Sequence, residues 1–288
     1  MGTSKEDVKS LFSGRATEWA GWYANAETPR LETSNLLARQ RLALEMVASA
    51  VPSSSRVLDV GCGTGEMAGR LIDRGYDVSG VDIAEPMVHR ARERWGADRF
   101  KVADGEHLPF DDNTFEAVVC LGVIEYQDAD ERTLREIRRV LKPGGRAVLS
   151  TPNSVSPLYY LDQATLALEE AAKPLYYFAK YRLRGRVIPP EPPSSAVTIR
   201  RYRRGPWMRR LRAAGLQPED WICRGWGWHR SRFGKAVSFL SRKTANARRI
   251  AAQLLGERAL SRFGGAVIRH RALNWIGAEQ IVRVRAIK

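Results

Sequence analysis

The stretch VLDVGCGTGEMA, residues 57–68, places three glycines at alternate positions directly after a short apolar run. An apolar run that ends in such a loop is typical of a buried strand that turns into a helix. Glycines have no Cβ atom, so they permit a tight turn and let a ligand lie against the backbone near unpaired N–H groups. The stretch therefore predicts a strand, a ligand-binding turn and a helix.

Strands and helices alternate after this stretch. The expected strands are Arg56–Val60, Asp77–Val81, Phe100–Val102, Phe115–Leu121 and Arg146–Ser150. The expected helices are Glu66–Arg74, Pro86–Trp95 and Glu131–Leu141. This spacing predicts right-handed crossovers and a parallel sheet covered on both faces, a doubly wound, Rossmann-like α/β fold. In such sheets ligands bind beyond the carboxyl ends of the strands.

Acidic residues stand at these strand ends. Asp82 comes 21 positions after Gly61, where a carboxylate can accept hydrogen bonds from both ribose hydroxyls of a nucleotide. Asp104-Gly105-Glu106 follows the third strand and is placed to accept from an adenine amine. Each Asp taken alone has an ordinary alternative role as a turn former or helix cap. Together, these strand-end residues predict a nucleoside site.

The type of nucleoside follows from the loop itself. A nicotinamide-binding loop reads G-x-G-x-x-G, whereas here the third glycine, Gly65, comes one position early. Asp59 precedes the loop. An additional carboxylate suits a cofactor with a cationic amine and a sulfonium better than one with a pyrophosphate.

Taken together, these motifs resemble the class I S-adenosylmethionine-dependent methyltransferases (methyltransferase domain type 11). The resemblance is carried by D-x-G-x-G-x-G (59–65), Asp82, D-G-E-x-L-P-F (104–110), D-N-T-F-E (112–116) and L-K-P-G-G (141–145). It implies S-adenosylmethionine as cofactor, S-adenosylhomocysteine as product and a seven-stranded sheet with an antiparallel last strand. The cofactor-binding residues expected from the motifs and the resemblance are Trp19, Tyr23, Arg41, Asp59, Gly61, Cys62, Gly63, Gly65, Asp82, Ile83, Met87, Asp104, Gly105, Glu106 and Leu121.

The N-terminal segment points to one family within this class. F-S-G-R-A-T-E-W (12–19) is similar to the F-x-x-x-A-x-x-W lead of the ubiquinone-biosynthesis O-methyltransferases, in which a lead helix folds over the cofactor. This implies that residues 1–40 form lid helices and that Arg41 contacts the methionine carboxylate. Ordinary core packing of these aromatic residues is the alternative.

One motif of that family is missing. The family carries E-x-x-E-H beyond the fourth strand, proposed to hold a divalent metal, whereas residues 122–126 read GVIEY and keep only one carboxylate. A single carboxylate without histidine is a poor metal site, so we expect no metal. The candidates for a general base or for substrate contact are Glu125, Tyr126, Tyr202 and His229. A structural role is the alternative for each.

The rest of the chain returns to the sheet after two insertions. A helix at about Arg204–Ala214 and a strand at Pro218–Cys223 precede the last strand, Glu279–Ile287. Residues 154–197 and 225–277 are expected as helical caps that face the substrate. We therefore expect a single domain over residues 1–288.

The net charge of +15 is concentrated in the C-terminal part. Residues 178–288 carry 26 basic and 5 acidic side chains, whereas residues 1–177 carry 21 and 27. Such a distribution favours an anionic partner such as lipid head groups, phosphate or nucleic acid. Residues 230–255 combine seven Arg or Lys with apolar residues at helical spacing, which favours an amphipathic helix on an anionic membrane. A solvated, arginine-rich surface is the alternative.

The location of the protein is predicted from what the sequence lacks. The N-terminal residues are polar and charged, and no apolar run is long enough to span a bilayer. The three cysteines are odd in number and far apart, which argues against a disulfide framework or a zinc site. Cytoplasmic residence is expected, with peripheral membrane association.

The combined prediction is a methyltransferase that transfers to oxygen on an apolar, lipid-like or lipid-linked small molecule. Nucleic-acid methylation is an alternative that the basic region favours, although the sequence lacks an N-P-P-Y-type signature and a recognisable RNA-binding appendage. A non-catalytic adenosylmethionine-binding protein is the other alternative.

Overall fold

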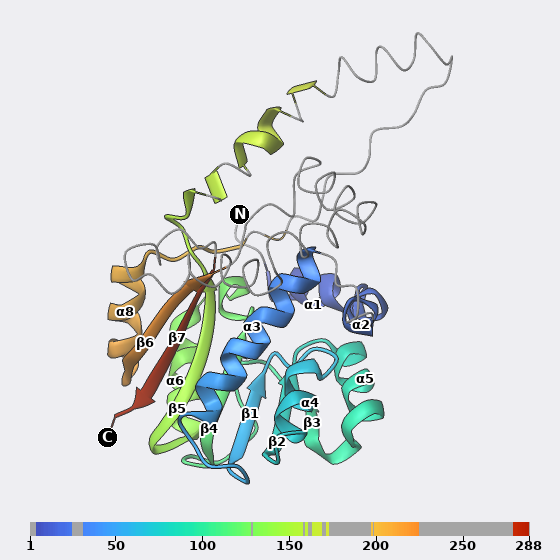
Figure 1. The fold of residues 1–288 in the computed structure, drawn as a ribbon. Helices are drawn as coiled ribbons and strands as arrows, with labels where there is room; N and C mark the ends of the chain where they lie inside the picture. The colour runs from blue at the N-terminus through green and yellow to red at the C-terminus, as the bar shows by residue number, and fades with distance from the viewer. Residues whose placement is uncertain are drawn as a thin grey trace, which may run out of the picture. The chain divides into compact units, whose positions relative to one another are not determined.

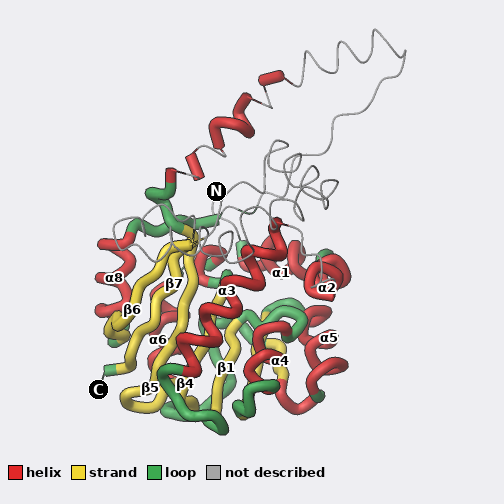
Figure 2. The backbone as a smooth tube through the Cα atoms, viewed as in Figure 1, coloured by secondary structure: helices red, strands yellow, loops and turns green. Residues whose placement is uncertain are grey.

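A seven-stranded mixed sheet forms the core of the computed structural model of this chain (Figures 1 and 2). The structure describes residues 4–24, 31–127, 129–157, 159–160, 163–168, 171–172, 197, 199–224 and 279–287. The chain divides into two compact units, where the sequence predicts one domain. The sheet unit contains Met1–Asn153, Ala196–Ile222 and Glu279–Lys288, and the other contains Ser154–Ser195 and Cys223–Ala278, close to the two expected insertions.

The strand order confirms the expected fold class. The strands are β1 (Arg56–Val60), β2 (Asp77–Asp82), β3 (Phe100–Val102), β4 (Phe115–Leu121), β5 (Leu141–Pro152), β6 (Leu216–Arg224) and β7 (Glu279–Ala286), in the spatial order β3-β2-β1-β4-β5-β7-β6. Strands β1 to β5 pair in parallel. β7 runs antiparallel to β5, with Glu279 opposite Pro152. β7 therefore starts at the edge where the parallel strands end.

Helices surround this sheet. They are α1 (Lys5–Ser13), α2 (Ala16–Ala24), α3 (Leu31–Ala48), α4 (Glu66–Ile72), α5 (Glu85–Trp95), α6 (Asp130–Val140) and α8 (Arg204–Ala213), with short 3₁₀ helices η1 (Ala97–Arg99) and η2 (Ile124–Tyr126). α1, α2 and the first half of α3 occupy the region expected as lid helices. No described helix is both long and apolar enough to cross a membrane.

Both faces of the sheet are buried because neighbouring residues on a strand point to opposite sides. On one face, α6 and α8 pack against a cluster that contains Leu58 and Val60 of β1. On the other face, α3, α4 and α5 pack against a cluster that contains Val57 of the same strand. Figure 1 shows α3 crossing in front of the sheet and α6 behind it. The unit is thus a three-layer α/β/α arrangement.

The boundary between α6 and β5 differs from the expectation. The sequence predicts a helix up to Leu141 and a strand from Arg146, whereas α6 ends at Val140 and β5 begins one residue later. The pairing of β4 with β5 is irregular between Phe115 and Ala117, which accommodates this segment. A Cβ atom on Gly145 would lie 3.0 Å from the carbonyl oxygen of Glu116, so a side chain here would crowd the backbone of β4.

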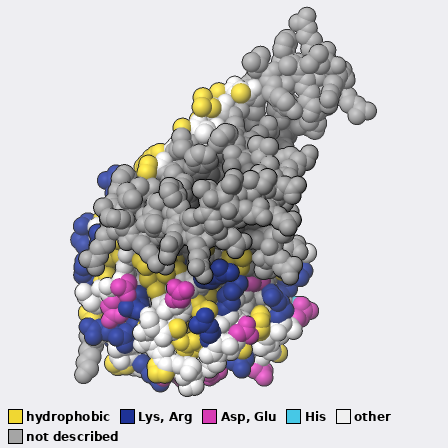
Figure 3. Space-filling view, in the orientation of Figure 1, with side chains coloured by type: hydrophobic (Ala, Val, Ile, Leu, Met, Phe, Trp, Pro, Cys, Tyr) yellow, Lys and Arg dark blue, Asp and Glu magenta, His cyan; other side chains and the backbone are white. Residues whose placement is uncertain are grey.

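The described part of the basic region includes α8. The exposed arginines of this helix are Arg204, Arg209 and Arg212, and Arg203 directly before it is exposed as well. Figure 3 shows Lys and Arg side chains at the left edge of the view, where Figure 1 draws α8. The amphipathic segment expected at residues 230–255, most of the two expected caps and His229 lie outside the described residues.

Candidate functional site

A cavity of about 220 Å³ lies at the carboxyl edge of the sheet. It is bounded by the loop after β1, the ends of β2, β3 and β4, and helices α1 to α3. The expected cofactor residues that line it are Trp19, Asp59, Gly61, Cys62, Gly63, Asp82, Ile83, Met87, Asp104, Gly105 and Leu121. The structure therefore brings most of the candidate cofactor residues into one cavity.

The first two loop glycines shape the floor of the cavity. Gly61 has a φ angle of +73°, and a Cβ atom there would lie 2.1 Å from Cγ2 of Val123. Its N–H donates to the carbonyl oxygen of Val81 at 2.7 Å, which ties the loop to β2. Gly63 has a φ angle of +55° and donates its N–H to Oδ2 of Asp82 at 2.9 Å. The loop needs glycine both for its backbone conformation and for space.

Gly65 has a different role from the one expected. It stands before the first residue of α4 with a φ angle of +84° and is absent from the cavity lining. A Cβ atom on Gly65 would lie 2.7 Å from Cδ1 of Trp95. This glycine therefore lets α4 and α5 pack closely and positions the loop from behind.

Asp82 lies where the sequence predicts a ribose-binding carboxylate. Oδ1 accepts the N–H of Ala84 and Oδ2 accepts the N–H of Gly63, both at 2.9 Å. Burial raises the pKa of Asp82, while these backbone hydrogen bonds oppose the rise. Because a carboxylate oxygen can accept more than one hydrogen bond, both oxygens keep acceptor capacity for a ligand.

Asp59 lines the cavity and has one buried carboxylate oxygen without a partner among the described residues. The residue is 2% exposed, and among the described residues its Oδ2 atom has no hydrogen-bond partner. Burial, together with the negative charges of Asp82 and Glu66, raises the pKa of Asp59 to about 7. A buried acceptor without a partner is costly, so a cationic ligand group at this position would be stabilised.

A lysine of α1 joins the acidic segment after β3. Nζ of Lys5 lies 2.6 Å from Oδ2 of Asp104 and 2.8 Å from Oε2 of Glu106. Burial opposes the charge of Lys5, but these hydrogen bonds and charges leave its pKa raised. Asp104 lines the cavity, whereas Glu106 lies buried behind it, 3.4 Å from Arg132. Glu106 therefore anchors α1 and is not part of the cavity wall.

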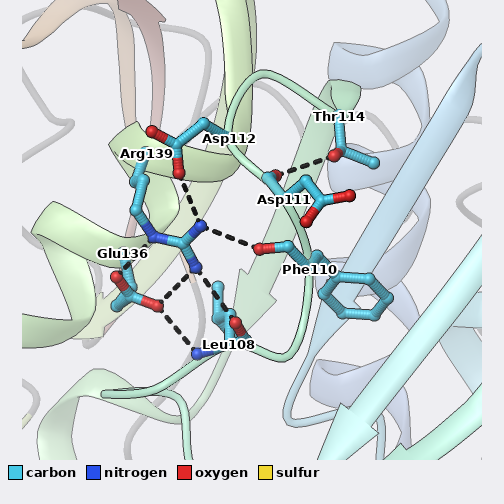
Figure 4. Close-up of polar contacts among 7 residues, drawn as sticks. All are labelled: Leu108, Phe110, Asp111, Asp112, Thr114, Glu136 and Arg139. Carbon is cyan, nitrogen blue, oxygen red and sulfur yellow. Dashed lines mark hydrogen bonds and ion pairs between the residues drawn. The ribbon is translucent and has the colours of Figure 1, made fainter.

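The loop after Glu106 is held by one arginine of α6 (Figure 4). Arg139 donates to the carbonyl oxygens of Leu108 and Phe110 at 3.0 and 2.8 Å, and to Asp112 at 2.8 Å. Glu136 pairs with the same guanidinium at 2.7 Å and accepts the N–H of Leu108 at 2.8 Å. The motifs D-G-E-x-L-P-F and D-N-T-F-E thus form a fixed loop that positions Asp104.

Aromatic side chains of the N-terminal helices cover the cavity. The ring of Phe12 makes edge contacts with Trp19 at 5.9 Å and with Tyr126 at 5.3 Å, measured between ring centroids. All three residues line the cavity. Tyr23 belongs to α2, and the position of its side chain lies outside the described structure.

The structure places Arg39 in the cavity instead of Arg41. Arg41 is exposed on α3 and is absent from the lining, so its expected contact with the cofactor is not supported. Arg39 lines the cavity, its side chain is 12% exposed, and its Nη1 atom lies 2.9 Å from Glu279. Lys5, Arg39 and Glu279 were all missed by the sequence analysis.

Two of the four candidate bases line the cavity. Glu125 and Tyr126 line the cavity. Tyr202 does not: it is buried, and its hydroxyl donates to Asp130 at 2.8 Å, which together with burial raises its pKa and makes it a poor base. His229 lies outside the described residues.

Glu125 is the acidic group that stands out among them. It is 7% exposed, and within the described residues its Oε2 atom accepts no hydrogen bond. Burial raises the pKa of Glu125 to about 7. A carboxyl group with this pKa can exchange a proton near neutral pH.

Comparison with known proteins identifies this core. Residues 58–149 match the family model described as a methyltransferase domain. The malonyl-[acyl-carrier protein] O-methyltransferase of Erwinia pyrifoliae is 41% identical over 96 residues, 33% of this chain and 37% of that protein. The ubiquinone/menaquinone biosynthesis C-methyltransferase UbiE of Desulfotalea psychrophila is 40% identical over 116 residues, 38% of this chain and 46% of that protein. This chain carries a class I S-adenosylmethionine-dependent methyltransferase domain.

Solved structures share the fold of the methyltransferase domain. Magnesium protoporphyrin IX methyltransferase from Synechocystis PCC 6803 has a TM-score of 0.58 and 13% identity, and the match covers 98% of this chain and 99% of that chain. The 1,6-didemethyltoxoflavin-N1-methyltransferase of Burkholderia thailandensis has a TM-score of 0.55 and 16% identity, with 98% and 88% covered. This chain spans less than half of the length of the two curated relatives named above, 37% and 46%.

The cavity of the methyltransferase domain suits its cofactor chemically. The loop from Gly61 to Gly63 gives room for a ligand against the backbone, Asp82 can accept ribose hydroxyls, and Asp59 offers an unsatisfied acceptor to a cationic amine. Asp104 is the acceptor available to the adenine amine. Within the described ranges, no group of three His, Cys, Asp or Glu side chains is placed to hold a metal ion.

Proposed function

We propose that the protein is an S-adenosylmethionine-dependent O-methyltransferase whose acceptor is an apolar, lipid-like or lipid-linked small molecule. One observation carries the choice of oxygen: the buried acidic residue Glu125 lines the same cavity as the glycine loop. A neutral hydroxyl group needs a base when it is methylated, whereas an amine can attack without one. The O-methyltransferase among the relatives is consistent with this choice.

The apolar character of the acceptor is supported by the cavity wall. The apolar side chains of the lining that belong to the N-terminal helices, α4 and the segment after β4 are Val8, Phe12, Leu36, Met67 and Val123. Such a wall excludes water, which would otherwise hydrate the nucleophile and compete with it. A hydrophobic acceptor would be held by this wall, with its hydroxyl group near Glu125.

The chemistry divides between cofactor and protein. Bound S-adenosylmethionine would supply an electrophilic methyl group on a positively charged sulfur. The glycine loop and Asp82 would orient the cofactor, and the α1 and α2 aromatic residues would close the cavity over it. Glu125 would accept the hydroxyl proton of the acceptor as the new O–CH₃ bond forms and the S–CH₃ bond breaks, with neutral S-adenosylhomocysteine as the leaving group. The proton would then pass to solvent.

A lipid-linked acceptor is also supported by charge. The exposed arginines of α8 and the excess of basic residues at 178–288 would attract an anionic bilayer. Peripheral membrane association is therefore part of the proposal. Flotation with anionic vesicles should carry more protein than flotation with neutral vesicles, and salt should reduce the difference. Equal absence from both kinds of vesicle at low salt would exclude this part.

The release of S-adenosylhomocysteine tests the proposal. The enzyme would be incubated with adenosylmethionine in a series of separate reactions. One reaction would contain a lipid extract, one a set of phenols and alcohols, and one RNA. We expect turnover with a lipid or apolar hydroxyl compound, and a loss of about 100-fold or more in Glu125→Gln with cofactor binding retained. Turnover with RNA alone, or full activity in Glu125→Gln, would contradict it.

A further inference from the structure

An ion pair beside the cavity joins two distant parts of the chain. Arg39 lies on α3, and Glu279 is the first residue of β7, with Nη1 and Oε1 2.9 Å apart. Their side chains are 12% and 23% exposed. An ion pair shielded from water to this degree acts more strongly on its neighbours than an exposed pair, because solvent screens it less.

The space for this guanidinium is provided by Gly122. A Cβ atom on Gly122 would lie 3.0 Å from Nη1 of Arg39, so a side chain at this position would crowd the guanidinium. Gly122 has a φ angle of +75° and donates its N–H to Oγ of Ser150 at 3.0 Å, which fixes its backbone. The residue that directly follows β4 therefore leaves room for the Arg39 guanidinium in the cavity wall.

Glu125 lies three residues beyond this glycine and faces the same cavity. Its backbone carbonyl accepts the N–H of Arg200 at 2.9 Å, which holds η2 in place. Its Oε2 atom has no partner among the described residues. The backbone of Glu125 is thus held in place, while nearby charged groups act on its carboxyl group through space.

We propose that Arg39 and Glu279 are positioning residues that together set the proton-accepting strength of Glu125. This inference rests on the proposed role of Glu125 as the base. Glu279 holds the guanidinium at the cavity wall, and the guanidinium favours the ionised form of Glu125. Glu279 itself carries a like charge and favours the protonated form.

The charged and titratable neighbours of Glu125 agree with this assignment. Beyond the effect of burial, Arg39 and Arg201 lower the pKa of Glu125 and Glu279 raises it. Among the described residues, Cys120 of β4 and Tyr202 also interact with Glu125, and the pKa of each is raised by burial first. Arg39 and Glu279 are therefore an opposed pair from α3 and β7 that acts on one carboxyl group.

A titration of Glu125 by NMR tests the proposal without cofactor or acceptor. The protein would be prepared with isotope-labelled glutamate side chains, and the Glu125 carboxyl signal would be assigned by its loss in Glu125→Gln. Glu279→Gln removes the like charge but keeps an amide oxygen that can accept a hydrogen bond from Arg39, so the guanidinium stays in place and we expect the titration midpoint to fall by about one pH unit. We expect the midpoint to rise by about one unit in Arg39→Met. Arg39→Lys should restore the midpoint to near its original value because it keeps the charge.

A distant ion pair supplies the control. Asp77 and Arg99 form an exposed pair, 3.3 Å apart, and Asp77 stands at the opposite end of β2 from the cavity. Asp77→Asn should leave the midpoint unchanged. Shifts in the same direction in Glu279→Gln and Arg39→Met, or no shift in either, would overturn the proposal. The titration does not measure methyl transfer, so it can be compared with the assay of the proposed function. Opposed shifts of the Glu125 midpoint in a protein that shows no methyl transfer would reject the proposed function alone. Methyl transfer without such shifts would reject this inference alone.

Discussion

The backbone N–H of Gly63 donates a hydrogen bond of 2.9 Å to Oδ2 of Asp82, which ties the glycine loop to the end of β2. The carboxylate that would bind the ribose therefore also holds the loop against which the cofactor would lie. Oδ1 of Asp82 accepts the N–H of Ala84 in addition, so one side chain organises two segments of the cavity.

Removal of this carboxylate should weaken the cofactor site. Asp82→Ala removes both backbone contacts and the acceptor for the ribose, and we expect a loss of roughly 2 to 4 kcal/mol in adenosylmethionine binding. Asp82→Asn keeps one acceptor oxygen and should lose less. Equilibrium dialysis with radiolabelled adenosylmethionine measures both. Unchanged affinity in Asp82→Ala would remove Asp82 from the site.

The structure and the family resemblance place different arginines of α3 at the cofactor site. Arg39 lines the cavity and can offer its charge to the methionine carboxylate, whereas Arg41 is exposed to solvent. We expect Arg39→Met to weaken adenosylmethionine binding by at least about tenfold, since a buried charge partner is lost, and Arg41→Met to change it less than about twofold. The opposite ranking in a dialysis experiment would contradict the assignment of Arg39 to the cofactor site.

The contacts of Lys5 should control how long the cofactor stays bound. Lys5→Met leaves Asp104 and Glu106 without this cation and frees α1 from the segment after β3. We expect adenosylmethionine to dissociate several-fold faster, which stopped-flow fluorescence can follow because Trp19 lines the cavity. Lys9→Met is the matched control, because Lys9 is exposed on the same helix. Equal rates in the two variants would exclude the role of Lys5.

The raised pKa of Glu125 makes stability depend on pH. The folded-state pKa is about 7 and the ordinary value is 4.5, so between these values the folded chain keeps a proton that the unfolded chain has lost. Stability therefore falls as pH rises from about 4.5 to 7 and stays lower above that range. Glu125→Gln removes this loss and should stabilise the ligand-free protein by roughly 1 to 3 kcal/mol more at about pH 8 than at about pH 5.

Thermal unfolding at these two pH values measures the effect. Glu116 is a useful control because its pKa is lowered instead of raised. Burial raises this pKa, but the hydrogen bonds from Lys142 and from the backbone N–H of Arg56 outweigh burial. Its contribution is lost only as pH falls below the ordinary range of a Glu. Glu116→Gln should therefore change the unfolding temperature by a similar amount at about pH 5 and about pH 8. A Glu125→Gln effect that does not grow with pH would contradict the assignment.

The sheet and the strand-end residues could be predicted because their signals are local. The apolar runs, the glycine loop and the aspartates that follow β2 and β3 each lie within a few residues of the element that positions them. Parallel pairing then brings the strand ends together without further information. For the same reason the sequence predicts Asp59 and Glu125 as site residues. It does not predict that Arg39 lines the same cavity.

The missed residues depend on distant contacts or on helix rotation. Lys5 meets Asp104 across 99 positions and Arg39 meets Glu279 across 240, and such pairings leave no local pattern. Arg39 and Arg41 each lie three or four positions from apolar residues on both sides, so the periodicity of α3 does not choose between them. Gly65 and Tyr202 have the residue types of a site, but packing against Trp95 and pairing with Asp130 place them in structural roles.

A calorimetric titration of S-adenosylhomocysteine into the ligand-free protein measures whether this cavity binds the cofactor. We predict saturable binding at one site per chain, strongly weakened when Asp59 and Asp82 are both replaced by alanine in a variant that remains folded. The absence of saturable heat, or undiminished binding to that double variant, would contradict the assignment of this cavity to the cofactor.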